Sequence, residues 1–279
     1  MTLNPPRFFT SSILPVRESL LLKGGTRNKL PLQVRVGYFN HPALGHTLID
    51  TGYGARLTQP FAKVGLHLSL YRRLLKPSVL SQEPISDGLA PLGLHKSDIA
   101  TVILTHFHAD HIGGLADLPQ ARILTSRQGW ATVKGKGKTR NALAGVFTEL
   151  LPEDFESRLT FFEDAAVVEA PFGLGAARDI AEDGSILVVD LPGHHEVHVG
   201  VFFPGFPQPL LYATDVQWLL QAVYEDRCPG FPATLTLHDR NATLASVAKL
   251  RTVAASGGDV VLCHDPIPHR LDLPMQRPK

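Results

Sequence analysis

The sequence predicts an α+β protein, a four-layer αββα sandwich in which helices cover two β-sheets. Short apolar runs ended by turn residues occur along the chain and outnumber the helical patterns, which lie late in each half. A regular parallel α/β sheet would instead show strands and helices in alternation. The 279 residues suffice for a sizeable core, and we expect a single domain over 1–279.

The expected strands are apolar runs bounded by Gly, Pro, Asn or Asp. They lie at 32–39, 47–50, 99–104, 121–126, 159–163, 185–191, 199–204, 209–215 and 259–265. Helices are expected at about 112–118, 141–150 and 243–256, the last with its apolar residues on one face at helical spacing.

Two further segments have an unusual composition. Residues 56–80 mix apolar side chains with arginine and lysine, which predicts a surface helix packed on the core; a wall or lid over a site is the alternative. Residues 134–140, KGKGKTR, form a basic run broken by glycine. We expect a solvated loop there, with anion contact as the alternative.

The overall composition excludes several classes of protein. Hydrophobic residues make up 44% and charged residues 19%, which is typical of a globular protein rather than a disordered one. A net charge of +1 gives no basic footprint for nucleic acid. No run approaches the roughly 20 apolar residues of a membrane span. Cys228 and Cys263 are too few for a disulfide framework, so we expect reduced thiols, a cytoplasmic protein, and neither nucleic acid nor membrane as a partner.

Three histidines and one aspartate crowd into six positions directly behind the strand expected at 99–104. They are His106, His108, Asp110 and His111, followed by a pair of glycines. Residues two apart in an extended chain point the same way, so His106 and His108 can bind one ion together. Imidazole and carboxylate suit zinc, iron or manganese. As core filling, each of these side chains would need its own buried partner, which favours a metal site.

Similar polar residues follow other expected strands. His194, His195 and His198 follow 185–191, Asp215 ends 209–215, and His264 lies near the end of 259–265. Since each stands where an apolar strand stops, we expect these side chains to meet at one edge of the sheets and to complete the ligand set.

These motifs resemble, in order, those of the metallo-β-lactamase-fold hydrolase superfamily over about 32–265. The matching stretches are LIDTGYG, THFHADHIGGL, DGSILVVDLPGHHEVHVG, LLYATD and VVLCHD. In layout the chain is most similar to the acyl-homoserine-lactone lactonase-like branch.

The resemblance implies a site for two divalent metal ions, zinc above all, although iron and manganese suit the same ligands. It places His106, His108 and His198 on the first metal, and Asp110, His111 and His264 on the second, with Asp215 between them. It also implies that His194 supports a ligand and that Asp50 orients a ligand imidazole. Asp110 would orient the attacking hydroxide and move its proton to the leaving group.

The implied reaction is hydrolysis of a small carboxylic ester, most of all a lactone. Related lactonases carry a tyrosine three residues after the bridging aspartate, where this chain has Trp218, which cannot act as an acid. Tyr224 or Tyr212 is a candidate to supply the hydroxyl group that this missing tyrosine would provide. His195 is either exposed to solvent, a support for a metal ligand, or in contact with substrate. The alternatives are a thioester hydrolase of glyoxalase II type, a phosphodiesterase or nuclease, and a binding protein without activity.

Overall fold

The structure is a computed structural model that describes residues 3–59, 65–231 and 233–275. The chain forms two compact units. Unit 1 comprises mainly Pro15–Leu32 and Phe162–His269, and unit 2 comprises Thr2–Leu14, Gln33–Phe161 and Arg270–Lys279. The single domain expected over 1–279 stays a prediction.

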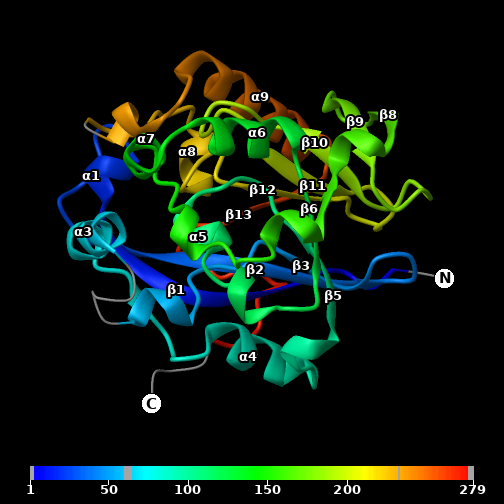
Figure 1. Ribbon diagram of the computed structural model, residues 1–279. Helices are drawn as coiled ribbons and strands as arrows, with labels where there is room; N and C mark the ends of the chain where they lie inside the picture. The colour runs from blue at the N-terminus through cyan, green and yellow to red at the C-terminus, as the bar shows by residue number, and fades with distance from the viewer. Residues whose placement is uncertain (1–2, 60–64, 232, 276–279) are drawn as a thin grey trace. The chain divides into compact units, whose positions relative to one another are not determined.

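A seven-stranded mixed sheet forms the centre of unit 2, with the order β4-β1-β2-β3-β5-β6-β7 (Figure 1). Its strands are β1 (Arg7–Arg17), β2 (Lys29–His41), β3 (Gly45–Ile49), β4 (Ser78–Val79), β5 (Ile99–Ile103), β6 (Arg122–Thr125) and β7 (Leu159–Phe161). Strands β3, β5, β6 and β7 are parallel to one another. The carboxyl ends of β3 and β5 therefore meet at one edge of the sheet, where the first ligand-type residues follow.

The helices of unit 2 are short. They are α3 (Leu66–Leu75), α4 (Pro84–Leu89), α5 (Ala109–Ile112), α6 (Arg127–Gly135) and α7 (Lys138–Leu143). Helix α4 begins with a proline, which suits a first turn, and its Gly88 lies against the ring of Phe9 in β1. The side chain of Ser126 caps α6 by accepting a hydrogen bond from the Gly129 backbone N–H.

Unit 1 contains a six-stranded sheet with the order β13-β12-β11-β10-β9-β8. Its strands are β8 (Ala166–Ala170), β9 (Gly175–Asp179), β10 (Leu187–Asp190), β11 (Val199–Phe203), β12 (Leu210–Thr214) and β13 (Asp259–Leu262), and its helices are α1 (Glu18–Leu21), α8 (Leu220–Tyr224) and α9 (Arg240–Ala255). Strands β12 and β13 are parallel, whereas the other neighbours are antiparallel. The residues that follow β12 and β13 are therefore placed side by side.

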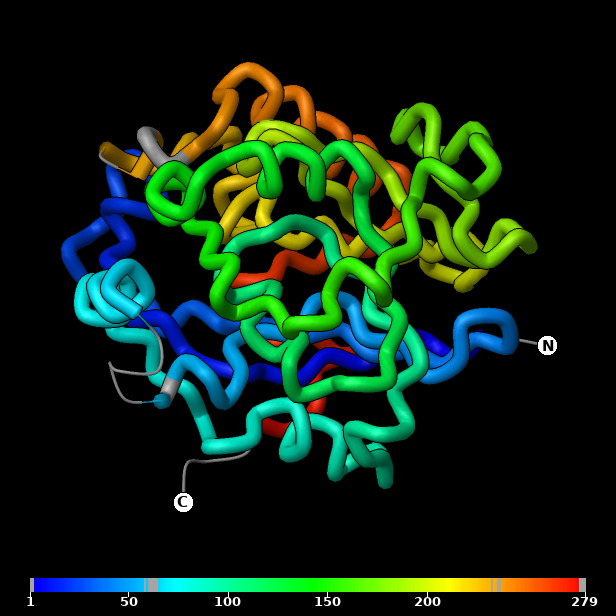
Figure 2. Tube along the Cα trace, viewed as in Figure 1, coloured from blue at the N-terminus to red at the C-terminus, as the bar shows by residue number. Residues whose placement is uncertain are grey.

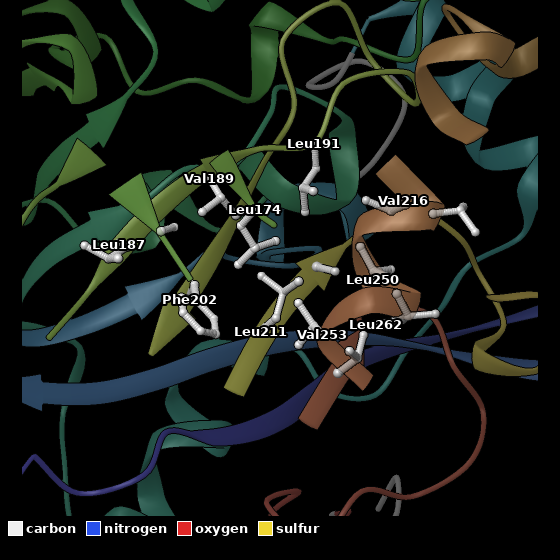
Figure 3. Close-up of a cluster of buried hydrophobic side chains, with 14 of the residues drawn as sticks. Leu174, Leu187, Val189, Leu191, Phe202, Leu211, Val216, Leu250, Val253 and Leu262 are labelled. Carbon is white, nitrogen blue, oxygen red and sulfur yellow. The ribbon is translucent and has the colours of Figure 1, made fainter. Parts of the chain in front are cut away.

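The core of unit 1 lies between this sheet and α9 (Figure 3). The strand register aligns Leu187, Phe202, Leu211 and Val260 in one row across four strands. Helix α9 covers the row with Val247, Leu250 and Val253, which share one helix face. Each such side chain contributes about 1.5–3 kcal/mol when fully buried, so the helix is held mainly by packing.

Each expected strand is present, but four strands and two of the expected helices differ from expectation. Strands β1, β4, β8 and β9 were not expected. The helix expected at about 112–118 is wrong, since α5 ends at Ile112 and a single 3₁₀ turn follows at Leu115–Asp117. The run 141–150 is also divided, between the end of α7 and a 3₁₀ turn at Thr148–Leu150. Among the described residues, no helix has the length and apolarity to cross a membrane.

The C-terminal segment is joined to β1 of unit 2, beside which it runs in Figure 2. Phe8 donates its backbone N–H to the Leu271 carbonyl and accepts from the N–H of Leu273. The guanidinium of Arg35, 1% exposed, donates two hydrogen bonds of 2.9 Å to the carboxylate of Asp272. This buried pair ties the segment to β2.

We predict that Asp272→Ala lowers the free energy of unfolding by about 3 kcal/mol, because the buried Arg35 charge loses its partner. Urea unfolding followed by circular dichroism measures the change. In the matched control Asp226→Ala, which removes a surface pair with Arg251, the loss should stay below about 1 kcal/mol. An equally small loss for both variants would contradict the role given to Arg35.

Candidate metal centre

The two histidines behind β5 point the same way. His106 Nε2 lies 3.1 Å from His108 Nδ1, and the two ring centroids are 4.7 Å apart. Phe107, between them, packs instead with the rings of Trp130 and Phe155, at 5.9 and 6.3 Å. This alternation confirms the geometry expected of an extended chain and places two imidazole nitrogens together.

Asp50 connects the end of β3 to this motif. Its buried carboxylate accepts hydrogen bonds from the backbone N–H of Thr105 at 2.9 Å and from the Thr105 hydroxyl at 2.8 Å. His111 Nδ1 lies 2.8 Å from the same carboxylate. With its proton on Nδ1, His111 keeps the lone pair of Nε2 for a metal, which is the orienting role expected of Asp50.

Helix α5 begins at Ala109, three residues before the start of the helix expected at about 112–118. Asp110 and His111 therefore lie on its first turn, with His111 Nε2 3.9 Å from Asp110 Oδ1. The rings of His106 and His111 are 3.9 Å apart, centroid to centroid. All four ligand-type side chains of the motif are thus gathered within unit 2.

Gly113 and Gly114 serve close approach rather than a tight turn. The backbone of Gly114 has φ −93°, which any residue can adopt. A Cβ on Gly114, however, would lie 2.6 Å from the Thr51 carbonyl oxygen, and one on Gly113 would lie 2.7 Å from that of Gly52. The glycines allow α5 to pack on the loop that carries Asp50.

Unit 1 holds the second group of ligand-type residues. His264 Nε2 lies 3.0 Å and His194 Nε2 3.3 Å from the same oxygen of Asp215, Oδ2. All three side chains are buried. The buried thiol of Cys263 belongs to this group too, because its sulfur lies within 4.8 Å of the ligand atoms of Asp215 and His264. Two imidazoles and one carboxylate are a donor set that suits zinc.

Both ring nitrogens of His198 make hydrogen bonds within the protein, unlike those of a histidine with one nitrogen available to a metal. Its Nδ1 lies 2.7 Å from the Leu191 carbonyl oxygen, so this nitrogen donates. Nε2 must then accept, and it receives the Thr214 hydroxyl at 2.6 Å and the Asp215 backbone N–H at 3.2 Å. The lone pair that would bind a metal is therefore engaged. The two histidines of this loop therefore differ in their contacts: His198 Nε2 accepts from Thr214 and Asp215, whereas His194 Nε2 lies beside the Asp215 carboxylate. The roles that the family resemblance implied for His198 and His194 stay a prediction.

The loop before His194 is held against the start of α9. The Gly193 carbonyl accepts from the backbone N–H of Asp239 at 2.9 Å, and Ser246 Oγ donates to the Pro192 carbonyl at 2.8 Å. Gly193 has φ +126°, and a Cβ there would overlap the backbone of Thr243. Glycine is therefore required where the chain turns toward His194.

The candidate substrate residues are only partly brought together. Trp218 lies edge-on to His194, with ring centroids 6.3 Å apart. His195 is not exposed: it is 6% accessible, and its Nδ1 lies 3.2 Å from the Val197 carbonyl oxygen. Tyr224 is 58% exposed at the end of α8, and Tyr212 is fully buried within β12. Of the aromatic candidates, Trp218 is thus the one in ring contact with a ligand-type residue among the described residues.

Several supporting residues were missed from the sequence. Thr105, Thr51 and Thr214 hold ligand-type residues or their backbone through hydroxyl hydrogen bonds. Asp265 accepts from the backbone N–H groups of Leu220 and Ile267 and so fixes the loop after His264. Each of these threonines is the neighbour in sequence of an aspartate or histidine at a strand end. This adjacency is the sequence feature from which their supporting role could have been predicted.

The chain belongs to the metallo-β-lactamase superfamily, whose sequence model matches residues 32–252. A probable metallo-hydrolase of Mycobacterium tuberculosis is 39% identical over 79 residues, which cover 28% of this chain. The chain spans about a quarter of that protein, since the match covers 24% of it. The N-acyl homoserine lactonase AttM of Azorhizobium caulinodans is 29% identical over 254 residues, covering 88% of this chain and 87% of the lactonase.

Solved structures confirm the fold. The AiiA protein of B. thuringiensis, solved as a mutant with N-decanoyl-L-homoserine at its active site, matches with a TM-score of 0.67 and 18% identity. The match covers 95% of this chain and 94% of that one. The α+β fold expected from the sequence, the four-layer metallo-β-lactamase sandwich with two mixed sheets and helices, is therefore correct.

We predict that Asp50→Asn weakens zinc binding by about 10–100-fold, because an amide N–H facing His111 Nδ1 would move the ring proton to Nε2. Competition with a chromophoric chelator measures the affinity. The matched control is Asp117→Asn in the same unit, since an asparagine oxygen can still accept from the Ala55 backbone N–H. Unchanged zinc affinity in Asp50→Asn would contradict the orienting role.

Proposed function

We propose that this chain is a metal-dependent hydrolase that opens a small carboxylic ester, a lactone in particular. The observation that carries the proposal is the paired arrangement of carboxylate and imidazole at strand ends in both units: Asp50 with His111, and Asp215 with His194 and His264. Superfamily membership and similarity to the lactonase AttM over most of the chain support it.

The proposed cofactors are two divalent metal ions, zinc first, with iron and manganese as alternatives. His106, His108, Asp110 and His111 of unit 2 would act with His194, Asp215 and His264 of unit 1. Their imidazole nitrogens and carboxylate oxygens fit this use. When bound, such a pair supplies a hydroxide at neutral pH and polarises the ester carbonyl.

The residues of the chain supply the remaining steps. Asp50 holds the tautomer of His111, so that its Nε2 faces the site. Asp110, which lies on the first turn of α5, would orient the attacking oxygen and move its proton to the leaving alcohol. Trp218 beside His194 offers an apolar wall and one N–H donor, and no phenol acid is used.

His194 is proposed as the ligand in place of His198, because His198 already uses both ring nitrogens. We predict that His194→Gln loses bound zinc and hydrolytic activity together. His198→Gln should keep most of its zinc while its free energy of unfolding falls by about 1–3 kcal/mol. Plasma mass spectrometry and urea unfolding measure the two effects. Full zinc in His194→Gln with none in His198→Gln would restore the assignment implied by the family.

The substrate class is tested by a panel of an N-acyl homoserine lactone, a glutathione thioester and bis(4-nitrophenyl) phosphate. We expect the zinc-loaded chain to hydrolyse the lactone fastest, and His108→Ala to lose both metal and activity. Faster thioester hydrolysis would favour the glyoxalase II type. Cleavage of the phosphodiester with the lactone left intact would contradict the proposal. No nucleic acid is proposed as a partner, because the net charge is +1.

A further inference from the structure

Helix α3 is apolar on two faces, and one of them is turned to solvent. Leu68 is buried, and Tyr71 packs on Phe147 with ring centroids 4.8 Å apart. On the outer side, Leu66, Leu70 and Leu74 follow one another at four-residue spacing and are 68%, 55% and 72% exposed. The expected packing of this helix on the core is thus correct for its inner face and leaves the outer leucines unexplained.

Helix α7 carries a further exposed leucine. It contacts α3, and its last residue, Leu143, is 85% exposed. We call Leu66, Leu70, Leu74 and Leu143 the leucine surface. Single exposed leucines are ordinary, but four large ones on two contacting helices indicate a binding surface.

The charges within the two segments that carry the leucine surface have one sign, although Lys134 pairs with Glu156 of a neighbouring segment at 2.9 Å. Residues 65–77 contain three Lys and Arg, and residues 134–145 contain four, whereas neither stretch contains Asp or Glu. Arg73, Lys76, Lys138 and Arg140 are exposed. In a chain whose net charge is only +1, this concentration of cations beside exposed leucines calls for an anionic partner.

We propose that the leucine surface docks the protein on an anionic lipid surface. Leucines on one side of a helix and Lys or Arg beside them are the features of a helix that lies in the membrane interface. The leucines would enter the acyl boundary while the cations contact anionic headgroups. Peripheral docking needs no spanning helix, so it departs from the expectation of no membrane partner without requiring a transmembrane segment.

A second copy of the chain fits this surface less well. In a two-fold symmetric dimer the same patch faces itself, so the cations of one copy would face those of the other. Neither helix offers a carboxylate to offset them. Lipid headgroups supply the missing negative charge.

The surface also adjoins the histidine motif. Two residues after Leu143, the Gly145 carbonyl accepts the backbone N–H of Ala109 at 3.1 Å. A Cβ on Gly145 would lie 3.2 Å from the ring of His108. Docking through α3 and α7 would therefore hold the motif near the lipid surface.

The test is co-sedimentation of the purified, metal-loaded chain with vesicles. One set is phosphatidylcholine alone, and the other is phosphatidylcholine mixed with anionic phosphatidylglycerol. We expect at least about tenfold tighter binding to the anionic set, lost at high salt, because each cation near the surface contributes about fivefold. Equal or no binding to the two sets would overturn the proposal.

Two variants separate the apolar and charged parts. Leu66→Gln/Leu70→Gln/Leu74→Gln and, separately, Lys138→Glu/Arg140→Glu should each weaken anionic-vesicle binding at least about tenfold. The matched controls, Val167→Gln/Leu244→Gln and Arg27→Glu/Lys29→Glu, replace exposed residues on other segments and should bind as the unchanged chain does. Circular dichroism confirms that each variant is folded.

Light scattering tests the alternative of a second copy. A dimer that the leucine variant converts to monomer, while its vesicle binding is unchanged, would overturn the proposal. Because lipid binding is measured without a substrate, its outcome is independent of the proposed hydrolysis.

Discussion

A buried carboxylate at the end of β3 is the contact on which the histidine motif of unit 2 depends. Burial of a carboxylate costs several kcal/mol unless hydrogen bonds offset it, and Asp50 is completely buried. Thr105 supplies two donors and His111 a third. Asp50 also has φ +59°, a conformation uncommon outside glycine. Such strain persists where the surroundings hold it, and residues of this kind concentrate at functional sites.

Unit 1 also places a buried carboxylate beside imidazoles, at the ends of different strands. Asp215 follows β12 and His264 follows the parallel strand β13, so the parallel pairing brings carboxylate and imidazole together. The antiparallel pair β10 and β11 contributes the loop with His194. His198, at the end of that loop, is fully hydrogen-bonded to the scaffold and holds Asp215 through its backbone. The proposed support and ligand roles are divided between two histidines four residues apart.

Much of the fold was predictable because buried strands leave continuous apolar runs. Strands β10 to β13 were expected for this reason. Strand β9, GAARD, was missed because its small and charged residues carry no β signal, and its pairing with β10 decides its structure. Strand β1 was missed because serines and a proline interrupt its apolar residues.

The ligand-type residues were predictable as a set, since each follows a strand, but their roles were not. The proposed choice between His194 and His198 rests on the hydrogen bonds of His198 with Leu191 and Thr214, which spacing along the chain does not encode. The same holds for Gly113 and Gly114, whose small size serves contact with a distant loop rather than a turn.

The most direct test of the proposed metal-dependent hydrolysis is zinc titration of the chelator-treated chain, with bound metal and lactone hydrolysis recorded together. We expect no hydrolysis without metal and full activity at about two zinc ions per chain. Full activity in the metal-free chain, or bound zinc with no hydrolysis of any ester in the panel, would contradict the proposal.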